Sequence, residues 1–505
     1  RLAKDGSLDP SFASGGRLVS GELPSARGVV VRDDGKILVV GSANAGMKVV
    51  RLTPAGAIDP SFGSGGSVAS KFGGVAFGEA IALLPDGRFL VAADRYLGNE
   101  IILARYLPDG APDASFGVGG AVIRTVDWPQ VGVRAVTVLP NGKIAVAGYA
   151  EDATGTSSVL EVLFASNGTP DAGFGPDGIR TYPFGADDAS AVDVLPDPPN
   201  GTVLICATQN SVKQTHYSLL RISGTGLVQA SEITDLNVDG RPRGGAARAD
   251  GKLIVAGRYG SAFGILQYTP SLQLDAAFGD GGIATAKFAP GALDEAEGVV
   301  VQGDGRIVAG GGAPQTPPQS APDFGFARFQ GYGVPLLADP FSSGALNWTQ
   351  VTGSWSKSGG YLSISTASTA RIDAPATWSP SGSSSCSQCT ILTKLGILAG
   401  GATTKLTVFA WNKSATDRVT LVYAPGTGKW MLKQQANGSS IRRRVKWPIS
   451  QLYAHDIGLS YDGSDLRFML DGKPLIRMPA IAAPSGNVGV QIRNGAVSID
   501  DVTIY

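Results

Sequence analysis

Short apolar runs on either side of tight-turn dipeptides dominate the first two thirds of the chain. A run such as Gly28-Val-Val-Val31 precedes an Asx-Gly pair, and a second run such as 37–40 follows it. Asp-Gly and Asn-Gly adopt the positive φ angles that two-residue hairpins need. Six such pairs occur, at Asp34-Gly35, Asp86-Gly87, Asn141-Gly142, Asn200-Gly201, Asp250-Gly251 and Asp304-Gly305. The pattern predicts six β-hairpins and little helix.

A longer motif recurs between the hairpins. Arg1–Phe12 returns almost position for position as Arg51–Phe62, and shorter copies end at Phe116, Phe174 and Phe278. One unit therefore consists of strand, tight turn, strand, variable loop, strand, Asp-x-x-Phe turn and strand. Four short antiparallel strands per repeat are typical of a propeller blade. The 70 glycines and 31 prolines agree with an all-β chain rich in turns.

The repeated phrases resemble those of a known family. Arg-Leu-x-x-x-Gly-x-x-Asp-x-Ser-Phe-Gly-x-Gly-Gly, alternating with Pro-Asp-Gly-Lys-Ile-x-Val-Ala-Gly, is similar to the bacterial delta-60 repeat over about residues 1–330. The resemblance implies a β-propeller in a secreted or surface protein, and it implies no activity. It weakens at 226–245, where the Asp-x-x-Phe turn is missing. Six hairpins favour six blades, and a chain that begins inside a motif leaves a seventh, partial blade open.

One aspartate recurs in each copy of the motif. These aspartates are Asp9, Asp59, Asp113, Asp171 and Asp275. We expect Asx-turns, in which the carboxylate accepts hydrogen bonds from nearby backbone N–H groups. A calcium site is the alternative, but one carboxylate per repeat falls short of the several oxygens that Ca²⁺ takes.

The repeat rhythm stops near residue 332, and the composition changes. Six of the seven tryptophans follow residue 340, and 459–475 has the pattern of a hairpin. With the opening phrase Ala338-Asp-Pro-Phe341 and the closing Asp-Asp-Val, this part resembles a laminin-G-like, concanavalin-A-type jelly roll. The resemblance implies that the first and last strands pair. We therefore predict a β-propeller over 1–332 and a jelly-roll β-sandwich over 333–505.

Candidate binding residues lie in both parts. The variable segments occupy one position in every repeat, so they share one face, and loops that vary on a constant scaffold commonly carry binding. The candidates there are Arg95, Tyr96, Tyr149, Arg258 and Tyr259. In the second part Trp378, Trp411 and Trp430 are predicted either to form a sugar-stacking platform or to fill the core. The basic run 442–446 either contacts an anionic glycan or lipid head group or forms a solvated strand edge.

Cysteines and acidic residues set the remaining expectations. Cys386 and Cys389 are expected to form a disulfide, because a zinc site would need two more ligands nearby. Cys206 lies in an apolar run and is expected in the core. Asp339 and Asp501 either flank a structural Ca²⁺ that joins the first and last strands or are satisfied by backbone. No other cofactor is expected.

Net charge and the motifs that the sequence lacks disfavour several classes of function. The formal net charge is zero and no basic stripe follows the repeats, which disfavours nucleic acid. No apolar run is long enough to span a membrane, and no nucleophile elbow, P-loop or dinucleotide motif occurs. We predict a non-enzymatic, secreted or cell-surface bacterial protein, outer-membrane association included, that binds a glycan or a surface protein. A structural subunit or adhesin component of an extracellular assembly is the alternative, followed by a polysaccharide hydrolase.

Overall fold

The computed structural model describes residues 1–504 except 4–5, 44–45, 185–187, 237, 289–292, 314–322, 332–336, 340–348, 353–355, 359–360, 374–388, 415, 450–453 and 485–486. Regular structure in these residues is β-strand apart from two short 3-10 turns, Pro176–Gly178 and Pro425–Thr427. The prediction of an all-β chain is confirmed.

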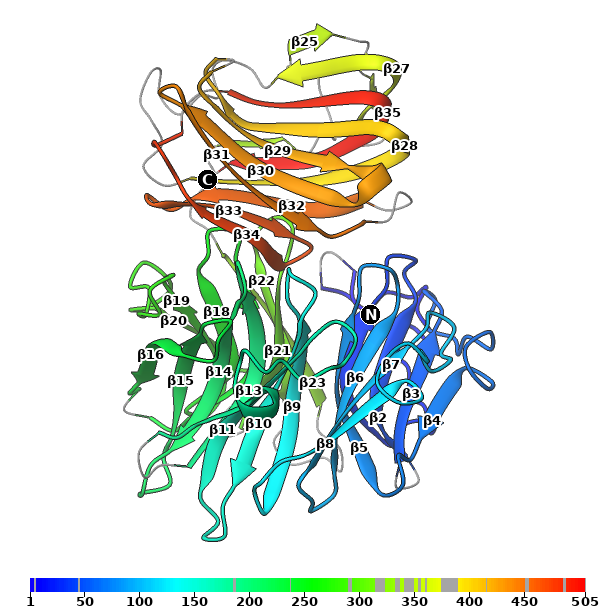
Figure 1. Ribbon diagram of the computed structural model, residues 1–505, viewed down its shortest axis with the longest axis vertical. Helices are drawn as coiled ribbons and strands as arrows, with labels where there is room; N and C mark the ends of the chain where they lie inside the picture. The colour runs from blue at the N-terminus through cyan, green and yellow to red at the C-terminus, as the bar shows by residue number, and fades with distance from the viewer. Residues whose placement is uncertain are drawn as a thin grey trace.

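The first part consists of small antiparallel sheets, five of four strands and one of three (Figure 1). The first holds β1 (Ser25–Val31), β2 (Ile37–Ala43), β3 (Gly46–Leu52) and β4 (Ser67–Ser70). The second sheet holds β5 (Ala76–Leu83), β6 (Phe89–Arg95), β7 (Glu100–Tyr106) and β8 (Ala121–Thr125), and the third holds β9 (Gln130–Val138), β10 (Ile144–Glu151), β11 (Ser157–Phe164) and β12 (Ile179–Tyr182). The fourth holds β13 (Asp188–Asp197), β14 (Gly201–Gln209), β15 (Thr215–Ile222) and β16 (Val228–Thr234). The fifth holds β17 (Gly240–Ala247), β18 (Leu253–Tyr259), β19 (Ala262–Tyr268) and β20 (Ile283–Ala286). The last holds β21 (Glu295–Val301), β22 (Ile307–Ala313) and β23 (Asp323–Phe329).

Each sheet is built by the local pattern of its sequence. Asx-Gly pairs form the turn between the first two strands of five sheets, where the glycine has a positive φ such as 75° at Gly35. The fourth sheet differs from the prediction, because Gly201 already pairs with Asp197 as the first residue of β14 and the turn is 198–200. Apolar side chains on alternate strand positions then pack between consecutive sheets. Met47 and Val49 of β3, for example, share one buried cluster with Ile81 of β5. These sheets, β1 to β23, are called the propeller sheets below.

The recurring aspartate forms the expected Asx-turn and a clamp as well. Asp59 accepts a hydrogen bond from the Ser61 N–H at 3.1 Å and another from Arg51 Nε at 2.8 Å. The Arg51 guanidinium lies 4.7 Å from the centre of the Phe62 ring and donates to the Pro108 carbonyl of the next repeat. The arginines of the first three copies, Arg1, Arg51 and Arg105, thus bond to the following repeat, whereas Leu163 and Gln267 take this position in the later copies.

The C-terminal part forms one sheet of twelve strands, called the C-terminal sheet below. Its strands are β24 (Leu337–Asp339), β25 (Thr349–Thr352), β26 (Ser356–Ser358), β27 (Tyr361–Asp373), β28 (Cys389–Asn412), β29 (Arg418–Ala424), β30 (Lys429–Ala436), β31 (Ser439–Lys446), β32 (Ala454–Tyr461), β33 (Asp465–Leu470), β34 (Lys473–Pro479) and β35 (Asn487–Ile504). Strand β28 pairs with β32 through its first half and with β29 through its second, so the sheet turns back on itself. The strand β24 pairs with β35, as expected of first and last strands.

The C-terminal sheet rests on the Asx-Gly end of the propeller sheets (Figure 1). Ser460 Oγ donates to the Ala249 carbonyl at 2.5 Å, and a side chain at Gly458 would meet the Ala249 methyl group at 2.4 Å. Met469 shares a buried cluster with Leu253. Because the variable loops join the second strand of each sheet to the third, they lie at the opposite end.

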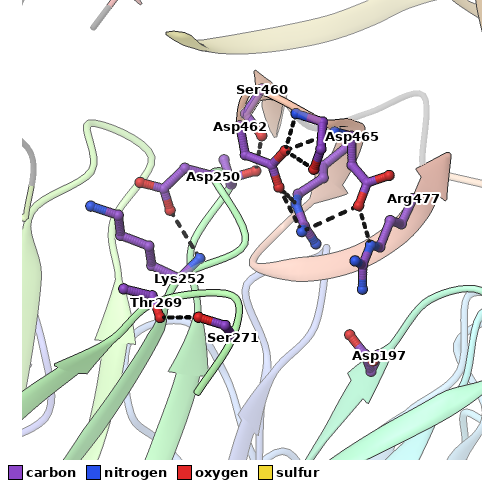
Figure 2. Close-up of polar contacts among 12 residues, drawn as sticks. Asp197, Asp250, Lys252, Thr269, Ser271, Ser460, Asp462, Asp465 and Arg477 are labelled. Atoms are coloured by element: carbon purple, nitrogen blue, oxygen red, sulfur yellow. Dashed lines mark hydrogen bonds and ion pairs between the residues drawn. The ribbon is translucent and has the colours of Figure 1, made fainter. Parts of the chain in front are cut away.

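Polar contacts surround this apolar junction. Figure 2 shows Ser460 and Asp462 beside Asp250, with Arg477 facing Asp197. Arg477 Nε donates to Asp465 at 2.7 Å. Burial lowers the pKa of Arg477, but this hydrogen bond and the charges of Asp465 and Asp197 outweigh it and raise the pKa. The two parts are therefore joined by a packed contact that is bordered by charged groups, and this contact fixes the walls of the cleft described next.

Candidate functional site

A cleft of about 460 Å³ lies where the C-terminal sheet meets three Asx-Gly hairpins. The size falls in the range of small-ligand sites. Its propeller wall consists of Leu84, Pro85, Val138, Pro140, Asn141, Gly142, Ser166, Pro199 and Asn200, and its opposite wall of Arg443, Arg444, Val445, Lys446, Trp447, Leu475, Ile476 and Arg477. Apolar surface therefore alternates with amides and with basic groups.

The basic wall is held by the edge strand β31. This strand pairs with β30 throughout, so its backbone is fixed while its charged side chains stay exposed. Val445 is buried and anchors the strand in the core. Trp430 Nε1 donates to the Trp447 carbonyl at 2.9 Å, which fixes the end of the strand. The strand therefore carries exposed cationic side chains on both of its faces, Arg444 and Lys446 on one and Arg443 on the other.

The charges on this wall are largely uncompensated. Among the described residues, Arg443, Arg444 and Lys446 form no ion pair, whereas Arg477 is paired with Asp465. Lys473 Nζ lies 5.4 Å from the centre of the Trp447 ring, and burial lowers the pKa of that ammonium group. An electropositive wall of this kind attracts anions.

The propeller wall offers neutral hydrogen-bonding groups. Asn141 Nδ2 donates to Asn200 Oδ1 at 3.0 Å, which links the turns of the third and fourth sheets. Prolines of three hairpins supply flat apolar surface beside these amides. Such a wall suits a ligand that carries both C–H faces and hydroxyl groups.

The structure places the predicted propeller residues at the end away from this cleft. Arg95 pairs with Glu100 at 2.7 Å, and Arg258 pairs with Asp239. Both guanidinium groups therefore hold their own loops together, which leaves less of their charge for a partner.

The three tyrosines of that end differ in accessibility. Tyr96 is exposed and packs edge-on against Phe77. Tyr149 lies under the Arg134 guanidinium, and Tyr259 is partly buried. Their role in binding remains a prediction.

The prediction of a sugar-stacking platform is wrong for two of the three tryptophans. Trp411 and Trp430 are buried in the core, where Trp430 stacks on Tyr423 with ring centres 4.3 Å apart. A sugar cannot reach either face. These two residues follow the alternative that the sequence left open, in which they fill the core. Trp378 lies outside the described residues.

The residues of the predicted disulfide and calcium site lie only partly within the described part of the chain. Cys389 is disulfide-bonded, Cys206 is free and buried, and Cys386 lies outside the described residues. The backbone of Asp339 pairs with Val502, but the side chains of Asp339 and Asp501 are outside the described part. Among described side chains, no group of three or more His, Cys, Asp or Glu could hold a metal ion.

Sequence reasoning missed Asn141, Asn200 and Trp447 as parts of one site. Asn141 and Asn200 were recognised only as turn residues. Trp447 directly follows the basic run 442–446, which was the available signal. Nothing in the sequence placed that run against the hairpins.

Comparison with known proteins supports the propeller. Residues 32–62, 84–116, 139–174 and 248–278 match the family described as a domain of unknown function (DUF5122) beta-propeller. Each match ends at the phenylalanine of an Asp-x-x-Phe turn. The fold and these matches define a β-propeller repeat protein. No curated protein matches the chain in sequence.

Solved structures also resemble part of the chain. The carbohydrate binding module CBM66 from Bacillus subtilis matches with a TM-score of 0.26 and 18% identity, covering 31% of this chain and 94% of that one. The Bacillus licheniformis beta-glucanase gives a TM-score of 0.28 and 12% identity, with coverage of 33% and 96%. The Emp47p carbohydrate recognition domain gives 0.28 and 12%, with coverage of 34% and 95%.

The described part of the chain contains no helix that could span a membrane.

Proposed function

We propose that this protein is a non-enzymatic glycan-binding protein, and that it binds an acidic polysaccharide in the cleft between β31 and the propeller hairpins. The observation that carries the proposal is that three cations on a cleft wall, Arg443, Arg444 and Lys446, form no ion pair with any described residue. Guanidinium groups bind carboxylates and sulfates through charge-assisted hydrogen bonds. The amides and prolines opposite would contact sugar hydroxyls and C–H faces.

The proposal includes an architecture and a compartment. We propose that the propeller sheets are delta-60 repeats and that the C-terminal sheet is a jelly roll. A secreted or cell-surface location is supported by the disulfide at Cys389, because disulfides persist in oxidising compartments.

The test is calorimetric titration with polygalacturonate and, separately, with neutral dextran. Binding of polygalacturonate and no binding of dextran is the expected result, with affinity falling as salt rises because exposed charges are screened. Equal binding of both polymers would contradict the proposal. So would release of reducing ends on prolonged incubation, which would indicate a hydrolase.

A charge reversal locates the site. The triple variant Arg443→Glu, Arg444→Glu, Lys446→Glu should weaken binding by at least about tenfold, since each contact to a charged group contributes on the order of 1.5 kcal/mol or more. Arg442→Glu is the matched control, because Arg442 lies on the same strand but not on the cleft wall. An equal loss in the control would place binding elsewhere.

A further inference from the structure

The third strand of each propeller sheet covers the next sheet with two side chains. The strand register identifies these pairs as Met47 and Val49, Ile101 and Leu103, Val159 and Glu161, Tyr217 and Leu219, and Phe263 and Ile265. All ten are at most 1% exposed. In the last sheet the same two positions are Phe324 and Phe326, which are 84% and 52% exposed.

The opposite face of the first sheet is open in the same way. Val29 and Val31 of β1 are 62% and 63% exposed. Their counterparts in the second sheet, Ile81 and Leu83, pack against the first sheet. The two end sheets thus expose the kind of apolar surface that every other pair of consecutive sheets buries, and exposed apolar patches commonly mark contact surfaces.

Residues at the start of the chain already occupy part of this opening. Arg1 bonds to Asp9 and to the Pro54 carbonyl, just as Arg51 bonds to Asp59 and to the Pro108 carbonyl. The Ala13 N–H donates to the Ala55 carbonyl at 2.7 Å. The first motif is therefore docked on the first sheet as the turn of a preceding sheet.

That turn does not belong to the last sheet. In the register of the repeat, Arg51 and Leu52 end the third strand, and Arg328 and Phe329 end it in the last sheet. Arg1 and Leu2 correspond to the same two positions, and one strand cannot have two ends. The first motif therefore completes a different sheet.

We propose that the faces of β23 and β1 hold between them a seventh sheet of the same repeat, whose fourth strand is residues 17–20. Its two faces would be apolar like those of the sheets now in place, and its outer turn is the first motif. This inference is independent of the proposed glycan site, because the surfaces are different.

The proposal is tested by adding the first three strands of such a sheet to the protein. A second copy of residues 74–104, placed directly before Arg1, recreates the junction between Ala104 and Arg105. The melting temperature should rise by about 5 °C or more, since a shift of 2–4 °C accompanies each kcal/mol in a domain of this size. Hydrogen exchange in β1 and β23 should slow at least tenfold.

The control carries Leu90→Asp and Leu103→Asp in the added copy, which places charges on the face meant for β1, and it should show neither effect. Unchanged melting and exchange with the intact copy would overturn the proposal. It would also fall if the unextended protein forms a dimer by light scattering and protects β1 and β23 in a concentration-dependent way, because the occupant would then be a second copy of the chain.

Discussion

The arginine that recurs in the motif makes the same contacts at sites that differ in their exposure to solvent. Arg51 combines an ion pair with Asp59, a contact over Phe62 and a hydrogen bond to the next repeat, and its side chain is buried. Arg1 makes the same contacts at the open end, where its side chain is 41% exposed. Burial, more than geometry, should decide what each contributes, because solvent screens exposed pairs.

Arg51→Ala should therefore lower the free energy of unfolding by about 2–4 kcal/mol, since it leaves a buried carboxylate with fewer partners. Arg1→Ala is the matched control and should leave stability nearly unchanged. Denaturant unfolding of both variants measures this. Equal losses would contradict the role assigned to burial.

Glu161 is a single residue whose protonation should make the stability of the fold depend on pH. It fills an apolar position between the third and fourth sheets, and its one described partner is the Thr202 hydroxyl at 2.7 Å. Burial raises the pKa of Glu161 from 4.5 to about 7. The folded state thus holds a proton that the unfolded state releases, so this group's effect on stability becomes less favourable as pH rises from 4.5 to 7.

Glu161→Gln should remove this dependence. At pH 8 the variant should be more stable than the natural protein by on the order of 2 kcal/mol, and at pH 4.5 the difference should be small. Chemical denaturation at the two pH values compares them. A difference that does not change with pH would show that Glu161 titrates normally.

At the scale of elements, the approach of β32 to the hairpin between β17 and β18 sets how the C-terminal sheet sits. Gly458 lies so close to Ala249 that any side chain there must displace one of the two parts. Glycine is required at this position by that close approach, and not by its backbone angle.

Gly458→Ala should destabilise the contact by about 1–3 kcal/mol, the usual cost of overpacking. The radius of gyration from solution scattering should increase as the parts separate. Adding Ala249→Gly removes the methyl group that the new side chain meets, so the double variant should recover the natural value. Failure of this rescue would place the strain elsewhere.

The sequence predicts elements far better than it predicts their contacts. Asx-Gly pairs and the Arg–Asp–Phe motif have local causes, and the hairpins and Asx-turns are found where they are expected. The orientation of Trp430 depends on which side of β30 faces the core, which alternation alone leaves open. Pairing of Arg95 with Glu100 and of Arg258 with Asp239 likewise depends on loop geometry.

At the scale of the whole molecule, two surfaces remain without a described partner. One is the pair of open sheet faces at β1 and β23, and the other is the basic wall of β31. The cleft exists only because the C-terminal sheet rests on the hairpin end, an arrangement that no local pattern encodes. The basic run 442–446 was visible in the sequence, but the amides and prolines opposite it were not.

Hydrogen exchange with and without polygalacturonate tests the central claim most directly. If polygalacturonate binds in the cleft, it should slow hydrogen exchange both in β31, on one wall, and in the turns at 139–143 and 197–201, on the opposite wall. Protection confined to the variable loops at the other end, with β31 unchanged, would contradict it.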